Sequence, residues 1–420
     1  MKKLALLLAL MMVACTCLTT ALADEDILVT WWGNQTRNER THDALMLFAS
    51  ENEGISFTEV PNSWDDYWKK VAADAQGDTL DVIQMDYQYL NQYAGSGLLL
   101  DLTPYVESGA LKIDDVNEGI INSGKVDDKL YAVCIGVNAP ALLYNKTVLD
   151  EAGITVKDNM TLDEFLDLSR EIYEKTGYKT NIGYGTDMVF GYILRGYGID
   201  LFANDKLNIT EEDAVKFFSL YETGITEGWL LGSEVFAETA IGTVEQDPMV
   251  YGSDPSYMSW CAFFWSNQVT AMQNAAPEGM EIGITTWPSP DPAKSNYLKP
   301  SQFFSVAAKT QHADTAVAVV DFWTNSVEAN KILLGERGIP ASAATADGIA
   351  DLLDESNQKV IAYINNVVNP NSSDVPAADP AGASEFYNLV DELQEAICYG
   401  AMTASDAAAQ LISGCPADLK

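Results

Sequence analysis

The first hundred residues alternate between short apolar runs and longer stretches in which apolar residues recur every three or four positions. The runs at residues 27–29, 55–60 and 80–85 are rich in apolar and β-branched side chains, which is typical of buried strands. Residues 37–52 and 65–75 have the spacing of amphipathic helices. Strands that alternate with helices in this way predict a parallel, doubly wound α/β lobe.

A second set of elements follows residue 138 and predicts a second lobe. Thr161 and Glu164 form a capping-box pattern for one helix, and Thr210 stands before another stretch of helical spacing. We expect the chain to cross between the lobes at residues 125–145 and at the proline-rich residues 288–300. The expected division is residues 24–137 plus 300–340 for the N-terminal lobe, and residues 138–299 plus 341–420 for the C-terminal lobe.

A chain of 420 residues is longer than a single hydrophobic core usually accommodates, so its length agrees with two lobes. The hydrophobic content of 47% is typical of a globular protein. The chain carries 61 acidic and 24 basic residues, a formal net charge of −37. Such a surface repels phosphate backbones and anionic lipid. We therefore expect no nucleic-acid partner, and contact with a membrane only through a lipid anchor or a membrane-bound partner.

The N-terminus has the pattern of an export signal. Two lysines precede an apolar run at residues 4–14, which is too short to span a bilayer. A small-x-small site at residues 21–23 predicts cleavage after Ala23, so residues 1–23 form a signal peptide. Residues 13–15 form an imperfect lipobox, which makes Cys15 the alternative as a lipidation site. On either route the protein is exported from a bacterial cytoplasm to the periplasm or the cell surface.

Residues suited to catalysis or to metal binding are sparse. The chain has two histidines and no HExxH, Rossmann GxGxxG or EF-hand pattern, which argues against serine–histidine catalysis, a metal site and a cofactor. Four cysteines follow the signal without metal-binding spacing. Cys398 and Cys415 either close a disulfide loop or stay buried thiols, and the sequence leaves both alternatives open.

Aromatic and polar side chains gather where strands are expected to end, the edge at which open α/β sheets bind ligands. A flat apolar ring beside hydrogen-bonding groups suits a sugar. Asp86 can accept hydrogen bonds from two sugar hydroxyls, or cap a helix. The alternatives are core packing for the tryptophans and an interlobe ion pair for Arg337. The candidate ligand-binding residues are Trp31, Trp32, Asn34, Arg37, Trp64, Asp86, Tyr87, Asn138, Trp260, Trp265, Asn267, Trp287 and Arg337.

Seven stretches, in this order, resemble the extracellular solute-binding proteins of ABC carbohydrate importers (family 1, which includes maltose- and multiple-sugar-binding proteins). They are residues 29–33 (VTWWG), 64–68 (WDDYW), 81–86 (DVIQMD), 97–106 (GLLLDLTPYV), 142–146 (LLYNK), 265–268 (WSNQ) and 335–340 (GERGIP). The resemblance implies a periplasmic-binding-protein-like fold, in which two doubly wound lobes are joined by hinge strands and hold a sugar in the cleft between them. It also implies sugar contacts at Asp86, at the loop after the first strand and at Arg337.

The expected function is therefore that of a substrate-binding protein, which captures a sugar and delivers it to the permease subunits of an ABC transporter. It breaks no bond and uses no cofactor. The many aromatic candidates favour an oligosaccharide, and the scarcity of cations near the cleft, Arg37 and Arg337 alone, makes an acidic sugar a weaker expectation. The alternatives are an exported glycosidase with paired carboxylates and an adhesin. The sequence gives neither the sugar's identity, length and linkage nor the permease.

Overall fold

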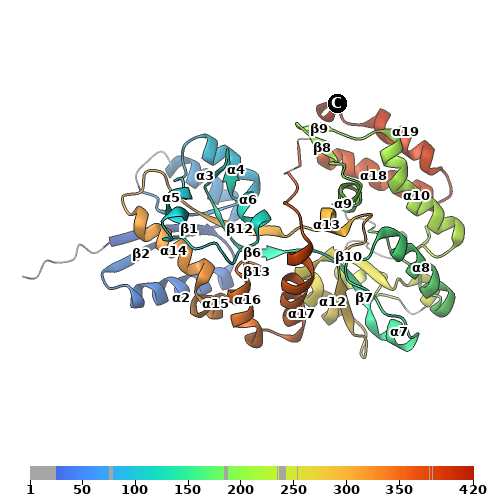
Figure 1. Cartoon of the computed structure of the whole chain (residues 1–420), viewed down its shortest axis with the longest axis horizontal. Coiled ribbons are helices and arrows are strands. Elements are labelled where there is room, and N and C mark those ends of the chain that lie inside the picture. The colour runs from blue at the N-terminus through green and yellow to red at the C-terminus, as the bar shows by residue number, and fades with distance from the viewer. Residues whose placement is uncertain are drawn as a thin grey trace, which may run out of the picture.

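The computed structural model describes residues 25–74, 79–183, 188–233, 235, 243–252, 254–377, 379–380 and 382–420. The predicted signal peptide, its predicted cleavage site and Cys15 lie outside the described residues. Within them the chain forms two α/β lobes that lie side by side (Figure 1). In the described part of the chain, no helix is long and apolar enough to cross a membrane.

The N-terminal lobe is built on a six-stranded sheet with the strand order β13-β6-β12-β3-β1-β2. β1 pairs in parallel with β2 and β3, as the alternation of strands and helices predicts. β12 returns antiparallel between β3 and β6, and β13 pairs antiparallel with β6 at the edge, so the sheet as a whole is mixed. The strands are β1 (Glu25–Trp32), β2 (Ile55–Asn62), β3 (Val82–Met85), β6 (Val133–Asn138), β12 (Lys299–Val306) and β13 (Ile339–Pro340).

Helices cover this sheet, and two of them begin at candidate residues that act as side-chain caps. The Asn34 side chain accepts a hydrogen bond from the backbone N–H of Arg37 and caps α2, while Asp86 accepts from Gln88 N–H and caps α4. The helices of this lobe are α2 (Gln35–Glu51), α3 (Trp64–Asp74), α4 (Tyr87–Gly95), α5 (Thr103–Glu107), α6 (Glu118–Ser123), α14 (Ala313–Asn325) and α15 (Val327–Leu333). α16 (Ala343–Ile349) packs against α14, α15 and β13.

The C-terminal lobe has a smaller sheet of three strands, in which β7 (Pro140–Asn145) lies between β10 (Cys261–Trp265) and β11 (Ile282–Thr285). Both pairings are antiparallel, and the parallel contacts of this lobe in the described residues are isolated bridges, such as Thr180 with Leu230. The capping box at Thr161 is confirmed at the start of α8, and Thr210 forms a second one before α10. The helices are α7 (Lys146–Glu151), α8 (Leu162–Thr176), α9 (Met188–Gly196), α10 (Glu211–Glu227), α12 (Val269–Ala275), α13 (Pro292–Ser295), α17 (Glu355–Tyr363), α18 (Ala383–Cys398) and α19 (Ala404–Gly414).

The chain passes between the lobes in several places. β6 leads through Ala139 directly into β7, and β12 brings the chain back from α13. A third passage leads from α16 through the 3-10 turn η4 (Ala350–Leu352) to α17, after which the chain runs through a π-helical turn, η5 (Ile364–Val368), toward α18 (Figure 1). One hydrophobic cluster contains side chains of both sheets and of α17, so the hinge region shares a core with both lobes. The exact division of the chain between the lobes remains a prediction.

The four cysteines of the described chain, Cys134, Cys261, Cys398 and Cys415, are buried thiols, and no disulfide joins them. Cys398 and Cys415 therefore stay buried thiols and do not close the disulfide loop that was the other alternative. Both belong to the hydrophobic core of the C-terminal lobe, with α18 and α19.

Candidate functional site

Two cavities adjoin each other, and the central one lies between the lobes. The central cavity, of about 430 Å³, takes its walls from the start of α4 in the N-terminal lobe, from the hinge strands β6 and β12, and from the end of β10 in the C-terminal lobe. The second cavity, of about 330 Å³, lies on the C-terminal lobe beside α9 and α18. Both are in the size range of ligand pockets, and they share the wall residues Met188, Tyr297, Val375, Pro376, Ala377 and Asp379.

A segment that we call the strap, residues 372–377 with 379–380, forms much of that shared wall and is held from both lobes. From the N-terminal lobe, the Tyr87 hydroxyl donates to the carbonyl of Pro376 at 3.3 Å, and Asn122 Nδ2 donates to Asp374 at 3.2 Å. From the C-terminal lobe, Arg195 Nη2 donates to the carbonyl of Asp374 at 2.7 Å and to Ser373 Oγ at 2.8 Å. A ligand in either cavity therefore lies against a segment that both lobes hold.

Asp86 brings the carboxylate of the site. It follows β3 directly, so its side chain stands at the edge of the sheet where β3 ends. Its Oδ1 accepts from Gln88 N–H at 3.0 Å, and no hydrogen bond from a described residue reaches Oδ2. Burial raises the pKa of this carboxyl, and the Gln88 N–H and the charge of Lys299 act in the opposite direction. The free oxygen can accept from a ligand hydroxyl.

Trp265 brings the aromatic surface. It ends β10, next to the hinge, and Lys299 at the start of β12 places its Nζ over the indole, 4.2 Å from the ring centroid. The rings of Trp287 and Tyr297 pack against the indole with centroid separations of 5.8 and 6.3 Å. Burial lowers the pKa of Lys299, and the charge of Asp86 raises it.

Several buried polar atoms at the cavities have no hydrogen-bond partner among the described residues. They are Asn138 Oδ1 in the central cavity, the Tyr297 hydroxyl in the shared wall and Arg195 Nε beside the second cavity. Buried polar groups are nearly always hydrogen-bonded, so such atoms are expected where a ligand or water completes the site. Together they supply acceptors and donors around an otherwise aromatic and aliphatic wall.

Of the candidates from the sequence, four line the central cavity: Asp86, Tyr87, Asn138 and Trp265. Lys299, Tyr297, Arg195 and the strap are ligand-facing residues that are not among the candidates from the sequence. The first two fall in or next to the expected crossing at residues 288–300, but no pattern marks which side chain of a crossing faces a ligand. The strap belongs to a stretch without periodicity, so only its position after α17 reveals it.

Three candidate tryptophans do not reach the cavities, because they are enclosed in the lobe cores. Trp31 is fully buried and its Nε1 donates to Asn38 Oδ1 at 2.8 Å. Trp260 is fully buried and its Nε1 donates to Thr180 Oγ1 at 2.8 Å. Trp287 is fully buried behind Trp265. These three tryptophans are therefore core residues, which was the alternative to ligand binding.

Trp32 and Trp64 belong to an aromatic cluster of the N-terminal lobe with Trp68. Trp32 packs edge-on against Trp64 at 5.0 Å and lies 5.5 Å from Trp68. Trp64 is 39% exposed, but neither it nor Trp32 lines the two cavities. Asn267 is exposed in the 3-10 turn η3 (Ser266–Gln268) and also lies outside both walls.

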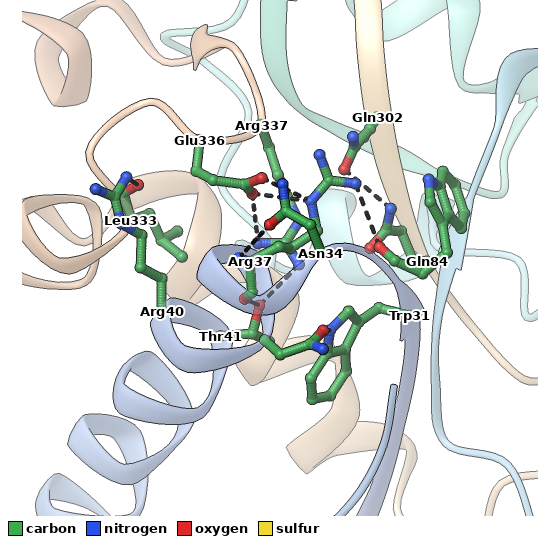
Figure 2. A network of polar contacts seen from close by, with 12 residues as sticks. Trp31, Asn34, Arg37, Arg40, Thr41, Gln84, Gln302, Leu333, Glu336 and Arg337 are labelled. Carbon is green, nitrogen blue, oxygen red and sulfur yellow. Dashed lines mark hydrogen bonds and ion pairs between the residues drawn. The ribbon is translucent and has the colours of Figure 1, made fainter. Parts of the chain in front are cut away.

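The remaining candidates, Asn34, Arg37 and Arg337, form a polar network inside the N-terminal lobe rather than a sugar site (Figure 2). Arg37 Nε lies 2.9 Å from both carboxylate oxygens of Glu336. With its amide oxygen turned toward Arg37, Gln302 accepts from both Nη1 and Nη2 at 3.0 Å. Because Glu336 and Gln302 bind its guanidinium group, Arg37 is not available to a ligand in the cleft.

Arg337 is the most enclosed member of that network. Its Nη2 donates to Thr41 Oγ1 at 2.8 Å, and Nη1 lies 3.8 Å from Glu336. Burial and the neighbouring Arg37 charge lower the pKa of Arg337 to about 9, while Glu336 raises it. The contacts join α2 to the turn before β13 within one lobe, so the expected interlobe ion pair is not formed.

In the described residues, no group of three or more histidine, cysteine, aspartate or glutamate side chains is arranged to hold a metal ion. The arrangement instead offers one indole face, one carboxylate and several neutral hydrogen-bonding atoms between two lobes. A two-lobed α/β fold with its ligand groups in the interlobe cleft defines the class of solute-binding proteins.

Comparison with known proteins gives the family. Residues 45–358, about three quarters of the chain, match the profile of the bacterial extracellular solute-binding protein family, and the chain belongs to that family. Members of this family are non-catalytic, which sets aside the glycosidase alternative. A family-1 extracellular solute-binding protein from Alicyclobacillus acidocaldarius superposes with a TM-score of 0.84, at 23% identity, over 93% of this chain and 97% of its own. The two proteins share the fold.

Two curated relatives are similar over different lengths. The arabinooligosaccharide-binding protein of Halalkalibacterium halodurans is 29% identical over 90 residues, 21% of this chain and 20% of the relative. The galactooligosaccharide-binding protein of Bacillus subtilis is 23% identical over 344 residues, 78% of this chain and 76% of the relative. The chain therefore spans only a fifth of the first relative and about three quarters of the second.

Proposed function

We propose that this protein is an extracytoplasmic substrate-binding protein that captures an oligosaccharide and delivers it to the permease of an ABC transporter. The observation that carries the proposal is the central cavity, where Trp265, Asp86 and the unpartnered Asn138 oxygen meet between the lobes. Two relatives whose names specify oligosaccharides support the same ligand class.

Each of these groups suits one part of a sugar. The apolar C–H face of a pyranose or furanose ring packs on an indole, and Trp265 is the tryptophan of the cavity wall. Asp86 Oδ2 can accept from a hydroxyl in a charge-assisted bond, which is stronger than a bond between neutral groups. The Asn138 oxygen and the Tyr297 hydroxyl would find partners in further hydroxyls.

The second cavity supports an oligosaccharide over a single sugar. It continues from the central cavity past Tyr297 and the strap, toward Arg195, Asp200 and Tyr387. A solute confined to the central cavity would leave this continuation, and the unpartnered Arg195 Nε within its wall, without a ligand contact. A chain of two or more sugar units would occupy both.

Cargo capture and delivery would use the two lobes. Walls from both lobes give the ligand more contacts in a closed arrangement, so it favours closure by its difference in affinity for the open and closed states. The closed form would then dock on the permease and release the sugar. The export signal that the sequence predicts at residues 1–23 would direct this cycle to the outside of the cytoplasm, with a lipid anchor at Cys15 as the alternative to free release.

A thermal-shift screen of the mature chain tests the ligand class. The panel would contain mono-, di- and trisaccharides of galactose and arabinose, maltose-series sugars and galacturonides. At a hundredfold excess over the dissociation constant, a bound ligand stabilises the native state by about 2.7 kcal/mol. We expect a clear upward shift with oligomers of one sugar and little with its monomer. No shift across the panel would contradict the proposal.

The transport role needs a separate test in the source bacterium. Deletion of the gene should abolish growth on the oligosaccharide that the screen identifies, while growth on its monosaccharide is kept. Complementation with the Asp86→Asn variant should restore secretion of the protein but not growth. Normal uptake in the deletion strain would show that the protein does not serve the transporter.

A further inference from the structure

The most unusual contact in the central cavity is the one between Lys299 and Trp265. The Lys299 ammonium lies 4.2 Å from the centroid of the only tryptophan in the described walls of the two cavities. We propose that Lys299 covers the stacking face of Trp265 in the unliganded protein, and that a saccharide must displace this ammonium toward Asp86 in order to bind. This inference rests on the proposed function and identifies a residue that sets its affinity.

Of the side chains that contact the Trp265 indole, Lys299 is the one that a saccharide can displace. Trp287 is fully buried and packs against Trp265 from the core of the C-terminal lobe, and the ring of Tyr297 packs at 72° to the indole. Both contacts belong to packed side chains that cannot leave without opening a void. Lys299, in contrast, lines the cavity with part of its surface open to solvent, although the surrounding cavity wall lowers its pKa by burial.

Lys299 is also free to move. Among the described residues, no hydrogen bond or ion pair within 4 Å holds its Nζ, and β12 fixes only its backbone through the pairing with Asn138 on β6. The flexible side chain can therefore swing away while the hinge strands stay paired. Asp86 lines the same cavity and attracts the ammonium, so the displaced charge has a partner of opposite sign nearby.

The exchange favours a particular chemistry in the solute. A cation over an indole is a modest interaction at an open site, equivalent to about a twofold to fivefold change in affinity. A saccharide replaces it with a C–H face on the ring and can offer hydroxyl oxygens to the displaced ammonium. A flat apolar molecule without acceptors can cover the ring but cannot bind the displaced ammonium, so Lys299 discriminates against such a molecule.

Calorimetric titration with galactotriose and arabinotriose tests the competition. The variants are Lys299→Ala, which uncovers the indole, and Lys299→Arg, which keeps a cation over it. The matched control is Lys294→Ala, a lysine of the preceding helix that lies outside both cavity walls and pairs with Asp291 at 3.4 Å. We expect twofold to fivefold tighter binding in Lys299→Ala and no tighter binding in Lys299→Arg or in Lys294→Ala.

Weaker or unchanged binding by Lys299→Ala would overturn the inference and leave the proposed function intact, because the wild-type protein would still bind. No binding of any saccharide of the thermal-shift panel by wild type and by Lys299→Ala would overturn both. Nuclear magnetic resonance gives an independent readout. The Lys299 methylene protons should show an upfield ring-current shift in the unliganded protein that disappears when trisaccharide is added. The absence of that shift without ligand would overturn the inference alone.

Discussion

Arg37 and Glu336 lie 299 residues apart in the sequence, yet Arg37 Nε is 2.9 Å from both carboxylate oxygens of Glu336. Both side chains are largely enclosed, with 15% and 10% of their surfaces exposed. Because Arg337 approaches the same carboxylate to 3.8 Å, one glutamate stands between two guanidinium groups. The contact joins the first turn of α2 to the turn before β13 and so fixes the carboxyl end of β1.

Glu336→Gln should be strongly destabilising. It would leave Arg37 and Arg337 without their common counter-charge in an enclosed site, and breaking a buried ion pair costs about 3–5 kcal/mol. Arg37→Met should cost less, because Glu336 keeps Arg337 as a partner. Urea unfolding of the three proteins measures the difference.

The control for that series is Glu328→Gln. Glu328 pairs with Lys331 at 2.6 Å on the exposed surface of α15, where ion pairs contribute little, so we expect a change below about 0.5 kcal/mol. Equal stability of Glu336→Gln and Glu328→Gln would contradict the role assigned to the Arg37–Glu336–Arg337 group.

Asp86 has two functions that substitutions can separate. Asp86→Asn should keep the cap of α4, because asparagine caps helices as well as aspartate does, and it should lose the charge-assisted bonds to the sugar. Asp86→Ala should lose about 2–4 kcal/mol of binding free energy and, in addition, about 1 kcal/mol of stability. Calorimetry and thermal unfolding measure the two effects, and wild-type affinity in both variants would remove Asp86 from the site.

Trp265 and Trp260 should respond differently to truncation. Trp265→Ala should reduce saccharide affinity by about tenfold and lower stability less than Trp260→Ala, since Trp265 lines the cavity. Trp260→Ala should cost about 3–5 kcal/mol of stability, because the side chain is fully buried and its Nε1 binds Thr180. A folded Trp260→Ala protein of wild-type stability that binds no sugar would reverse this assignment.

Asp247 predicts a pH dependence of stability. Its carboxyl is buried and accepts from Met249 N–H at 2.9 Å, and burial raises its pKa to about 7. In the unfolded chain the pKa is about 3.9, so between these values the native state holds the proton and the unfolded state does not. Stability from this group is therefore present at low pH and falls as the pH rises from about 4 to about 7.

Asp247→Asn should remove that dependence. The variant should be more stable than wild type above pH 7, by at most about 4 kcal/mol for a shift of about three pKa units, and the gain should shrink toward pH 4. Thermal unfolding at pH 4, 6 and 8 measures it, with the exposed Asp351→Asn as the control. A constant difference at all three pH values would contradict the buried, protonated carboxyl.

The amino-acid sequence by itself determined the elements and part of the site. Periodicity of apolar residues predicted helices at residues 37–52 and 65–75, within two residues of the observed bounds of α2 and α3, and side-chain caps predicted the starts of α8 and α10. It also placed Asp86 at the end of a buried strand. These features depend on residues a few positions apart, which is the range over which hydrogen bonding and amphipathicity act.

Only the tertiary structure decided which candidates face the ligand. Trp260 and Trp265 stand at the two ends of one strand region, but helix packing encloses the first, while the pairing of Trp265 with Pro140 sets the second beside the hinge. Arg37 fits the cleft by its sequence position, yet Glu336, 299 residues away, holds it. Burial and pairing depend on neighbours that are distant in the chain, and no local pattern specifies them.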